Sequence, residues 1–202
     1  MQLANPGKRI GAYIIDGLII STILSIIAIA SIDWEELFDL LKYISNNSQY
    51  ISPAEIEYLL IDIMVRPIFF STIGAIVLTI LYYNVLPLIW KHQTVGRAAT
   101  KILVVDENGN KPKFSKLFIR EAFGQGLIAS LISIIGMFGT TDFYFKVSST
   151  ASDLLSLFLI IGFIIMCGER KTTLYDLISK TRVVLKDSLN VSEPDMYDTL
   201  DA

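Results

Sequence analysis

The chain has 202 residues, of which 52% are hydrophobic and 18% are charged, and its formal net charge is −3. Soluble domains contain about a quarter charged residues, so this composition and a mean hydropathy of +0.54 exclude several soluble domains and indicate one helical membrane domain. Cys167 is the only cysteine, which excludes an intramolecular disulfide and a cysteine-based metal site. The expected partner is the lipid bilayer, and no nucleic-acid partner is predicted.

The first predicted membrane helix covers residues 8–31, and Asp16 is the only charge inside its apolar run. A bilayer core takes roughly 20 apolar residues, and a charge near its centre costs at least about 2.5 kcal/mol. Asp16 should therefore face protein or water and have a partner. Arg9 precedes it by about two helical turns, so we expect both side chains on one polar stripe that runs inward from the membrane surface.

The same stretch also has features of a cleaved signal peptide. Basic residues are followed by an apolar run and by the small-residue pattern at 28–30. However, the run is longer than the roughly 7–15 apolar residues of a signal peptide, and it contains Asp16. We therefore expect the chain to retain this helix as a membrane span.

The segment 33–66 differs in character, because most of its charges are carboxylates and its leucines recur at helical spacing. This pattern predicts an outer amphipathic segment, either on the membrane surface or as a docking surface. A capping-box pattern that begins at Ser52 predicts a helix start within it. The second membrane helix is predicted over residues 67–90, and Thr72 and Thr79 are its secondary polar candidates.

A basic loop follows the second helix. Within it, residues 102–105 have the composition of a short strand, and the Asn-Gly pair at 108–109 is typical of a turn. These features predict a small β-hairpin-like loop. A second strand is also predicted over 182–185, and it is an alternative partner for the strand at 102–105.

The third and fourth membrane helices are predicted over residues 114–138 and 151–168. Asp153 then lies near the outer end of the fourth helix. We expect a single membrane domain over residues 1–186, followed by an acidic and mobile tail over 187–202.

Lysine and arginine gather in three regions, namely the N-terminus, the loop between the second and third helices, and the segment after the fourth helix. Four spans place all three regions on one side of the membrane, and basic residues mark the cytoplasmic side. The predicted fold is therefore an all-α membrane protein with four transmembrane helices and with both termini in the cytoplasm.

Three charged motifs occur in order along this cytoplasmic side: an Arg-x₆-Asp stretch, a Thr-x-Gly-Arg segment with a downstream arginine, and an aspartate after the fourth helix. Their residues are Arg9, Asp16, Thr94, Gly96, Arg97, Arg120 and Asp176. Together these motifs resemble the RDD family of membrane proteins, which is named for one arginine and two aspartates. The resemblance implies a multi-pass protein of the bacterial cytoplasmic membrane, in a family for which transport and sodium/proton exchange have been suggested. Tyr175 departs from the histidine often found before the second family aspartate, which puts any imidazole role there in doubt.

One functional hypothesis is transport of a small ligand, or exchange of monovalent cations for protons, with Asp16 as the titratable group in the membrane. A buried carboxyl beside an arginine can exchange a proton for a cation. Hydroxyls such as those of Ser21, Thr72 and Thr79 would supply further oxygen ligands. Four helices are few for a transporter, so this hypothesis requires a homo-oligomer or a membrane protein partner.

The alternative hypothesis is a non-catalytic membrane adaptor or assembly factor. Arg9, Asp16 and Asp176 would then form a structural ion-pair network that Arg97 and Arg120 join. Removal of one partner from a buried ion pair costs about 3–5 kcal/mol, so such a network can matter for folding alone. In either case we expect Arg9 to lie within ion-pair reach of Asp16 or Asp176.

We do not expect an enzyme. The sequence contains no pattern of a nucleophile with its base, of a metal cluster, or of a phosphate-binding glycine loop, so no catalytic residue, cofactor or metal is predicted. The single histidine, His92, is expected to be solvated or to lie at the membrane interface.

Overall fold

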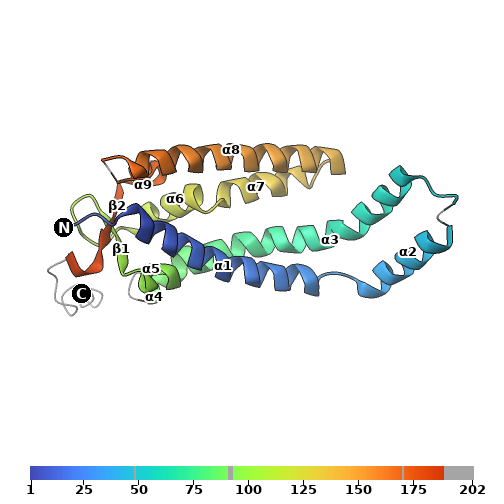
Figure 1. The fold of residues 1–202 in the computed structure, drawn as a ribbon, viewed down its shortest axis with the longest axis horizontal. Coiled ribbons are helices and arrows are strands. Elements are labelled where there is room, and N and C mark those ends of the chain that lie inside the picture. Colours follow the sequence, from blue (N-terminus) through green and yellow to red (C-terminus); the bar gives the residue numbers. More distant parts are fainter. Residues whose placement is uncertain (48, 91–92, 170, 189–202) are drawn as a thin grey trace.

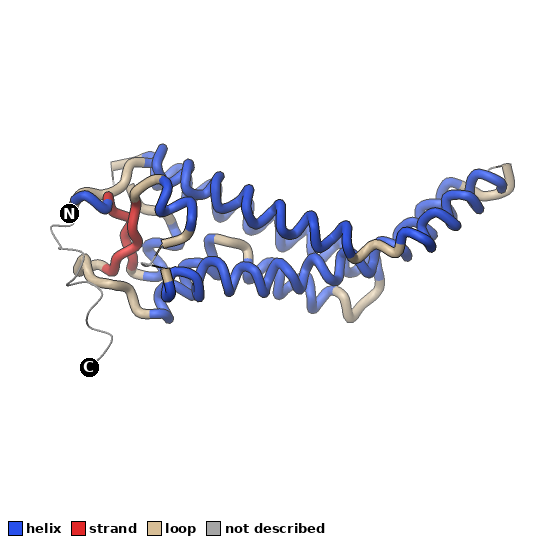
Figure 2. Tube along the Cα trace, turned by 90° about the horizontal axis from the view of Figure 1, so that it is seen from below, coloured by secondary structure: helices blue, strands red, loops and turns tan. Residues whose placement is uncertain are grey.

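The computed structural model describes residues 1–188 apart from residues 48, 91–92 and 170. Long helices run side by side along the molecule, and a small antiparallel sheet closes one end, which we call the sheet end (Figure 1). At the opposite end, the hairpin end, two helices project from the bundle (Figure 2). His92 and the acidic tail from residue 189 onward lie outside the described residues.

Helix α1 (Pro6–Ala30) begins where the Asn5 side chain accepts a hydrogen bond from the Lys8 backbone N–H, with proline in the first turn. Several of its apolar side chains are more than half exposed. Its buried residues are Arg9, Ala12 and Asp16. In a soluble protein the apolar residues would be buried and the polar ones exposed. Lipid favours the reverse, because apolar groups then face hydrocarbon while polar groups face protein.

Helix α3 (Pro53–Ile80) begins well before the predicted start at residue 67, which is therefore wrong. The predicted N-cap is confirmed, because the Ser52 side chain accepts a hydrogen bond from a first-turn N–H. Pro67 lies inside the helix, since transmembrane helices tolerate proline. Helical residues continue to Ile89, and these 37 residues extend about 55 Å, whereas a hydrocarbon core is about 30 Å thick.

The first turns of α3 therefore project beyond a membrane, and helix α2 (Trp34–Asn47) packs beside them (Figure 2). None of the residues of α2 is buried. At the base of this helical hairpin, Arg66 lies 3.9 Å from Asp33. The amphipathic segment predicted over 33–66 thus consists of α2 and the beginning of α3.

Near the sheet end, α3 continues as the π-helical segment η1 (Leu81–Val85) and then as α4 (Leu86–Ile89). Pro87 has no N–H, and its ring would collide with a carbonyl of the preceding turn in a regular α-helix. The π-helical turn relieves this conflict, because an N–H bonds to the carbonyl five residues back. The irregular geometry buries Tyr83 and Asn84 against the bundle.

The next span is a bent pair, in which α6 (Phe114–Gly124) and α7 (Leu127–Gly136) meet at 64°. Gly126 between them has a φ of +74°, in the left-handed region that favours glycine. The prediction of one continuous helix over 114–138 is therefore wrong. Three described helices are long and apolar enough to cross a membrane, and the bent pair makes a fourth if it counts as one span, as the predicted four-helix fold requires.

Helix α8 (Thr141–Cys167) also starts earlier than its predicted start at residue 151. The Thr140 side chain caps it by accepting a hydrogen bond from a first-turn N–H, and polar residues in the first turns face outward. Asp153 consequently lies near the middle of the helix. Its predicted position near the outer end is wrong.

The sheet joins β1 (Ile102–Asp106) to β2 (Thr181–Leu185) in antiparallel register. The second strand therefore comes from the C-terminal segment, which was the alternative pairing, and not from the residues after the local turn. That turn is present, and Gly109 adopts a φ of +86° in it. The N-terminus adds a single bridge from Leu3 to Val184.

Two short helices flank the sheet, α5 (Val95–Ala99) before β1 and α9 (Leu174–Ser179) before β2. A small apolar core connects the sheet to α1 and α6. Its members are Ala4, Ala12, Ile102, Val104, Leu117 and Val183. The sheet end therefore gathers the N-terminus, the middle loop and the C-terminal segment into one packed unit.

Candidate functional site

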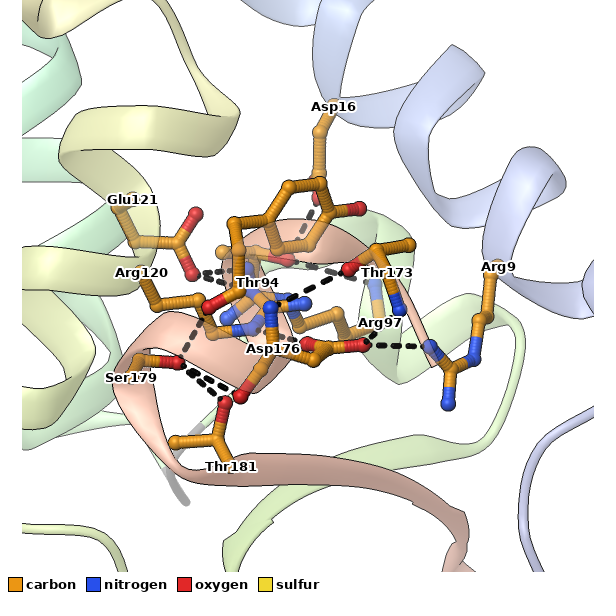
Figure 3. A network of polar contacts seen from close by, with 11 residues as sticks. Arg9, Asp16, Thr94, Arg97, Arg120, Glu121, Thr173, Asp176, Ser179 and Thr181 are labelled. Carbon is orange, nitrogen blue, oxygen red and sulfur yellow. Dashed lines mark hydrogen bonds and ion pairs between the residues drawn. The ribbon is translucent and has the colours of Figure 1, made fainter. Parts of the chain in front are cut away.

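Buried charged side chains gather where the sheet end meets the membrane helices (Figure 3). They come from α1, α5, α6 and α9, elements that are far apart in the sequence. Three arginines face three carboxylates in this cluster. They are Arg9, Arg97, Arg120, Asp16, Glu121 and Asp176.

Asp16 is enclosed by neutral hydrogen-bond donors and is only 2% exposed. Thr94 Oγ1 lies 2.7 Å from one carboxylate oxygen, while the Gly96 backbone nitrogen lies 2.7 Å from the other. Tyr82 Oη donates to that second oxygen at 2.6 Å. These three bonds hold the carboxylate, and no arginine among the described residues forms an ion pair with it.

Gly96 allows the beginning of α5 to lie directly against α1. A Cβ at this position would lie 2.8 Å from Asp16 Cγ and would collide with the Ala12 carbonyl oxygen. Thr94 is the N-cap of the same short helix, because its hydroxyl accepts a hydrogen bond from the Arg97 N–H. The Thr-x-Gly-Arg motif thus begins a helix whose first residues bind the Asp16 carboxylate.

Asp176 binds two arginines from different helices. Arg9 Nη1 lies 2.7 Å from one carboxylate oxygen, and Arg120 Nε lies 3.0 Å from the other. The Thr173 N–H donates to the same carboxylate at 3.2 Å, which completes a capping box at the start of α9. Arg9 also donates to the Val183 carbonyl of β2, so one arginine fastens α1 to both α9 and the sheet.

Glu121 links the remaining two arginines. Arg97 Nη2 and Arg120 Nη1 both lie 2.5 Å from the same oxygen of this carboxylate. Arg120 therefore bridges Asp176 and Glu121, and the ion pairs continue from α1 through α9 and α6 to α5. Truncation of any member would leave a buried charge without its partner.

The electrostatics of α9 follow from this arrangement. Burial would raise the pKa of Asp176, but the guanidiniums of Arg120 and Arg9 and the bonds from Thr173 outweigh it and hold the pKa below its usual value. Burial raises the pKa of the neighbouring Tyr175. The Arg120 guanidinium lies over the Tyr175 ring, 5.0 Å from its centroid, so the ring packs against the ion-pair network through a cation–π contact.

A cavity of about 40 Å³ lies inside the cluster. Its lining includes all three arginines and Asp16. Two buried donors, Arg9 Nε and Arg97 Nη1, have no hydrogen-bond partner among the described protein atoms. The cavity has room for a water molecule, which would give such donors an acceptor.

A model of the RDD family matches residues 3–180. The chain belongs to the RDD family. No curated protein and no solved structure matches it. With its apolar spans, it is an integral, multi-pass membrane protein of the RDD family, and the resemblance drawn from the three motifs is confirmed.

The three residues that name the RDD family do not all bind one another. Arg9 pairs with Asp176 and not with Asp16, so the expected ion-pair reach is met through the C-terminal segment. Arg97 and Arg120 join the network as expected. Among the secondary polar candidates, Thr94 and Gly96 bind Asp16.

Two further secondary candidates, Thr72 and Thr79, lie in α3, and neither is among the groups that bond to this carboxylate. Thr72 donates to the Ile68 carbonyl of its own helix, and Thr79 is buried. The sequence reasoning also missed the roles of Glu121 and Tyr82. A signal for Glu121 was present, since a carboxylate next to Arg120 in an apolar helix needs a cation on the same side.

Proposed function

We propose that this RDD protein is a non-catalytic membrane adaptor or assembly factor, in which the buried ion pairs have a structural role. The observation that carries the proposal is that every charged side chain of the cluster already has a partner within the chain. A group that exchanges a cation must be able to release its ligands. Asp16, with three short hydrogen bonds and almost no exposed surface, is held in place instead.

The docking surface in this proposal is the projecting hairpin of α2 and the first turns of α3. A groove of about 580 Å³ lies between them, and its apolar lining residues include Leu40 and Leu59. The lining of the same groove also includes four acidic residues, Asp33, Glu35, Glu36 and Asp39. This combination fits a partner protein that presents a basic amphipathic helix.

A second candidate function is transport of a small ligand, or exchange of monovalent cations for protons. The specific observation in its favour is Asp153, a second carboxylate at membrane depth, which is exposed on the surface of α8. Such groups often mark ion or proton pathways. Under either function we place the protein in the bacterial cytoplasmic membrane and expect no cofactor.

One flux experiment separates the two functions. Purified protein in liposomes is given a pH gradient, and sodium or potassium is added outside. We expect no cation-dependent collapse of the gradient from wild-type protein that is monodisperse and folded. A collapse that Asp16→Asn abolishes would overturn the structural role of Asp16, and a collapse that only Asp153→Asn abolishes would favour the second candidate.

The docking surface has its own test. A synthetic lysine-leucine amphipathic helix and a glutamate-leucine helix of the same length are titrated against the protein in nanodiscs of zwitterionic lipid. We expect the basic peptide alone to bind, and its affinity to fall at least tenfold when Glu35, Glu36 and Asp39 become amides. Equal binding to that variant would refute the hairpin as the site, and Glu107→Gln at the sheet end is the matched control.

A further inference from the structure

Helix α8 carries an exposed polar seam along its first four turns. Polar residues recur along it at alternating spacings of four and three, which keeps them on one face of a helix. The members are Asp142, Lys146, Ser149, Asp153, Ser156 and, as the first apolar member, Ile160. All of them are exposed, and the same spacing continues through Phe163 to Cys167.

From Asp142 to Ser156, the seam lies on the face of α8 opposite the packed face of the helix. The buried residues of α8 are Ala151, Gly162 and Met166, which lie on the opposite face at helical spacing. Helix α8 packs on α7 and α9 and forms an edge of the bundle (Figure 1). The seam residues of this face are exposed, and toward the sheet end Ile160 and Phe163 line a groove together with Tyr13 of α1.

A hydrocarbon core of about 30 Å that ends at Cys167 contains Asp153 in its outer third. Along the helix axis Asp153 lies about 18 Å from Thr141 and about 21 Å from Cys167, and the hydrocarbon core is about 30 Å thick. Among the described residues, neither Asp153 nor Lys146 forms an ion pair within the chain. Charged groups at this depth almost always face protein or water, so lipid alone is a poor environment for this face.

We propose that the seam is the contact surface for a second copy of this chain, with two α8 helices packed in parallel about a two-fold axis along the membrane normal. Both copies cross the membrane in the same direction, so such an axis brings the same residues to the same depth. The alternating spacing is that of a left-handed helix pair, and the small serines let two backbones approach closely.

The seam is self-complementary, which favours a second copy over an unrelated protein. Lys146 follows Asp142 by one turn, so the lysine of one helix can reach the aspartate of the other near the membrane surface. Deeper in the pair, Ser149 and Ser156 flank Asp153. The Ser149 hydroxyl donates to the Lys146 carbonyl in the single chain and would turn toward the partner's carboxylate in the pair. The two copies of Asp153 lie in one layer, between the serine layers of both helices.

The inference does not depend on the proposed function, because an adaptor and a transporter can both form dimers. Its test uses single cysteines in a Cys167→Ser background, placed by Ser149→Cys, by Ser156→Cys and, off the seam, by Leu154→Cys. Leu154 is exposed at nearly the same depth but faces about 100° away from Asp153. Membranes that hold each variant are treated with copper phenanthroline, and the dimer fraction is read on a non-reducing gel.

We expect more than half of the protein to cross-link from Ser149→Cys and from Ser156→Cys, and less than a tenth from Leu154→Cys. Equal cross-linking at all three positions would indicate random collision and would overturn the proposal. No cross-linking at any position, with a monomeric mass in nanodiscs, would overturn it as well. A different protein that cross-links to the seam in place of a second copy would do the same.

A second measurement probes the role of Asp153 in the pair. Energy transfer between labelled copies in liposomes gives the association constant as the lipid-to-protein ratio rises. Asp153→Asn keeps a hydrogen-bonding side chain and should retain association, whereas Asp153→Leu should weaken it about 3-fold to 20-fold. Unchanged association in the leucine variant would show that the polar layer does not hold the pair. Because Asp153 is exposed in the single chain, both variants should fold.

Discussion

At the scale of single residues, the RDD motifs place their charges in the protein interior, where an unpaired charge is costly. Arg9 and Asp176 come from opposite ends of the chain, yet they lie 2.7 Å apart and both are buried. Such a pair contributes little net stability compared with apolar packing, but its disruption is costly because the remaining charge stays buried. The network therefore specifies which segments meet at the sheet end.

The first prediction concerns Asp176→Asn. The substitution keeps the size of the side chain but leaves Arg9 and Arg120 without their shared countercharge, so we expect the free energy of unfolding to fall by about 3–5 kcal/mol. The measurement is reversible unfolding of purified protein in mixed detergent micelles. Asp187→Asn is the control, because that carboxylate is exposed in the same segment and should change stability by less than about 0.5 kcal/mol.

The second prediction is the pH dependence of the same contribution. The pKa of Asp176 is lower in the folded protein than in the unfolded chain, so at acid pH the unfolded chain binds the proton more readily. The stabilisation is therefore complete above the unfolded value of about 3.9 and is lost as pH falls through the folded pKa. Unfolding from pH 8 to pH 3 should show the stability gap between wild type and Asp176→Asn closing at the acid end. A constant gap would contradict the assignment.

The third prediction compares two glycines of the same region. Gly96→Ala places a methyl group 2.8 Å from Asp16 Cγ, so it separates α5 from α1 and weakens a hydrogen bond to a carboxylate. We expect a loss of about 2–4 kcal/mol in unfolding free energy. Gly17→Ala has no atom within 4 Å of the new Cβ and should be neutral or slightly stabilising, since alanine favours a helix. Equal effects of the two variants would argue against close packing at Gly96.

At the scale of elements, the sequence predicted helix caps and strands better than helix starts. The capping pattern at Ser52 and the strand pairing of 102–105 with 182–185 are both present. Membrane boundaries, however, were taken as helix boundaries. Both α3 and α8 begin earlier, because a helix can continue through polar residues into water when a cap satisfies its first N–H groups.

The candidate site was only partly predictable for a related reason. Motif residues such as Arg9 and Arg97 stand out as charges beside apolar helices. Which charges meet depends on tertiary packing across the whole chain. Spacing along α1 predicted one polar stripe, but it did not indicate that Arg9 and Asp16 bind different partners. The role of Tyr82 depends on the π-helical turn, which no periodicity of the sequence indicates.

The fourth prediction concerns the break between α6 and α7. Gly126→Ala would hold a side chain at a φ of +74° and would bring its Cβ to 2.9 Å from Leu155 Cδ2. We expect destabilisation of about 1–3 kcal/mol from the backbone and the contact together. Leu155→Ala removes the contact but not the backbone conflict. In the Leu155→Ala background, Gly126→Ala should therefore destabilise the protein less than it does in wild type, but it should still destabilise it. Unfolding in mixed micelles measures all three variants.

At the scale of the whole molecule, the two ends differ in both charge and shape. The sheet end gathers the basic motif segments and the buried network, whereas the hairpin end carries carboxylates on two helices that leave the bundle (Figure 2). Basic residues near span ends mark the cytoplasmic side, so the distribution predicts that the hairpin projects from the opposite face. A partner protein would then bind the hairpin on the outer side of the membrane, while the buried ion pairs hold the chain together on the cytoplasmic side.

The fifth prediction tests that polarity with single cysteines in a Cys167→Ser background. Tyr50 is 86% exposed at the tip of the hairpin, and Glu107 is exposed in the turn after β1. In spheroplasts, a membrane-impermeant maleimide should label Tyr50→Cys at once and Glu107→Cys only after permeabilisation. Leu157 is 55% exposed but lies within the apolar span of α8, so Leu157→Cys should react slowly in both cases because lipid shields the thiol from the aqueous reagent. Labelling of Glu107→Cys before permeabilisation would invert the topology, and the acidic groove would then face the cytoplasm.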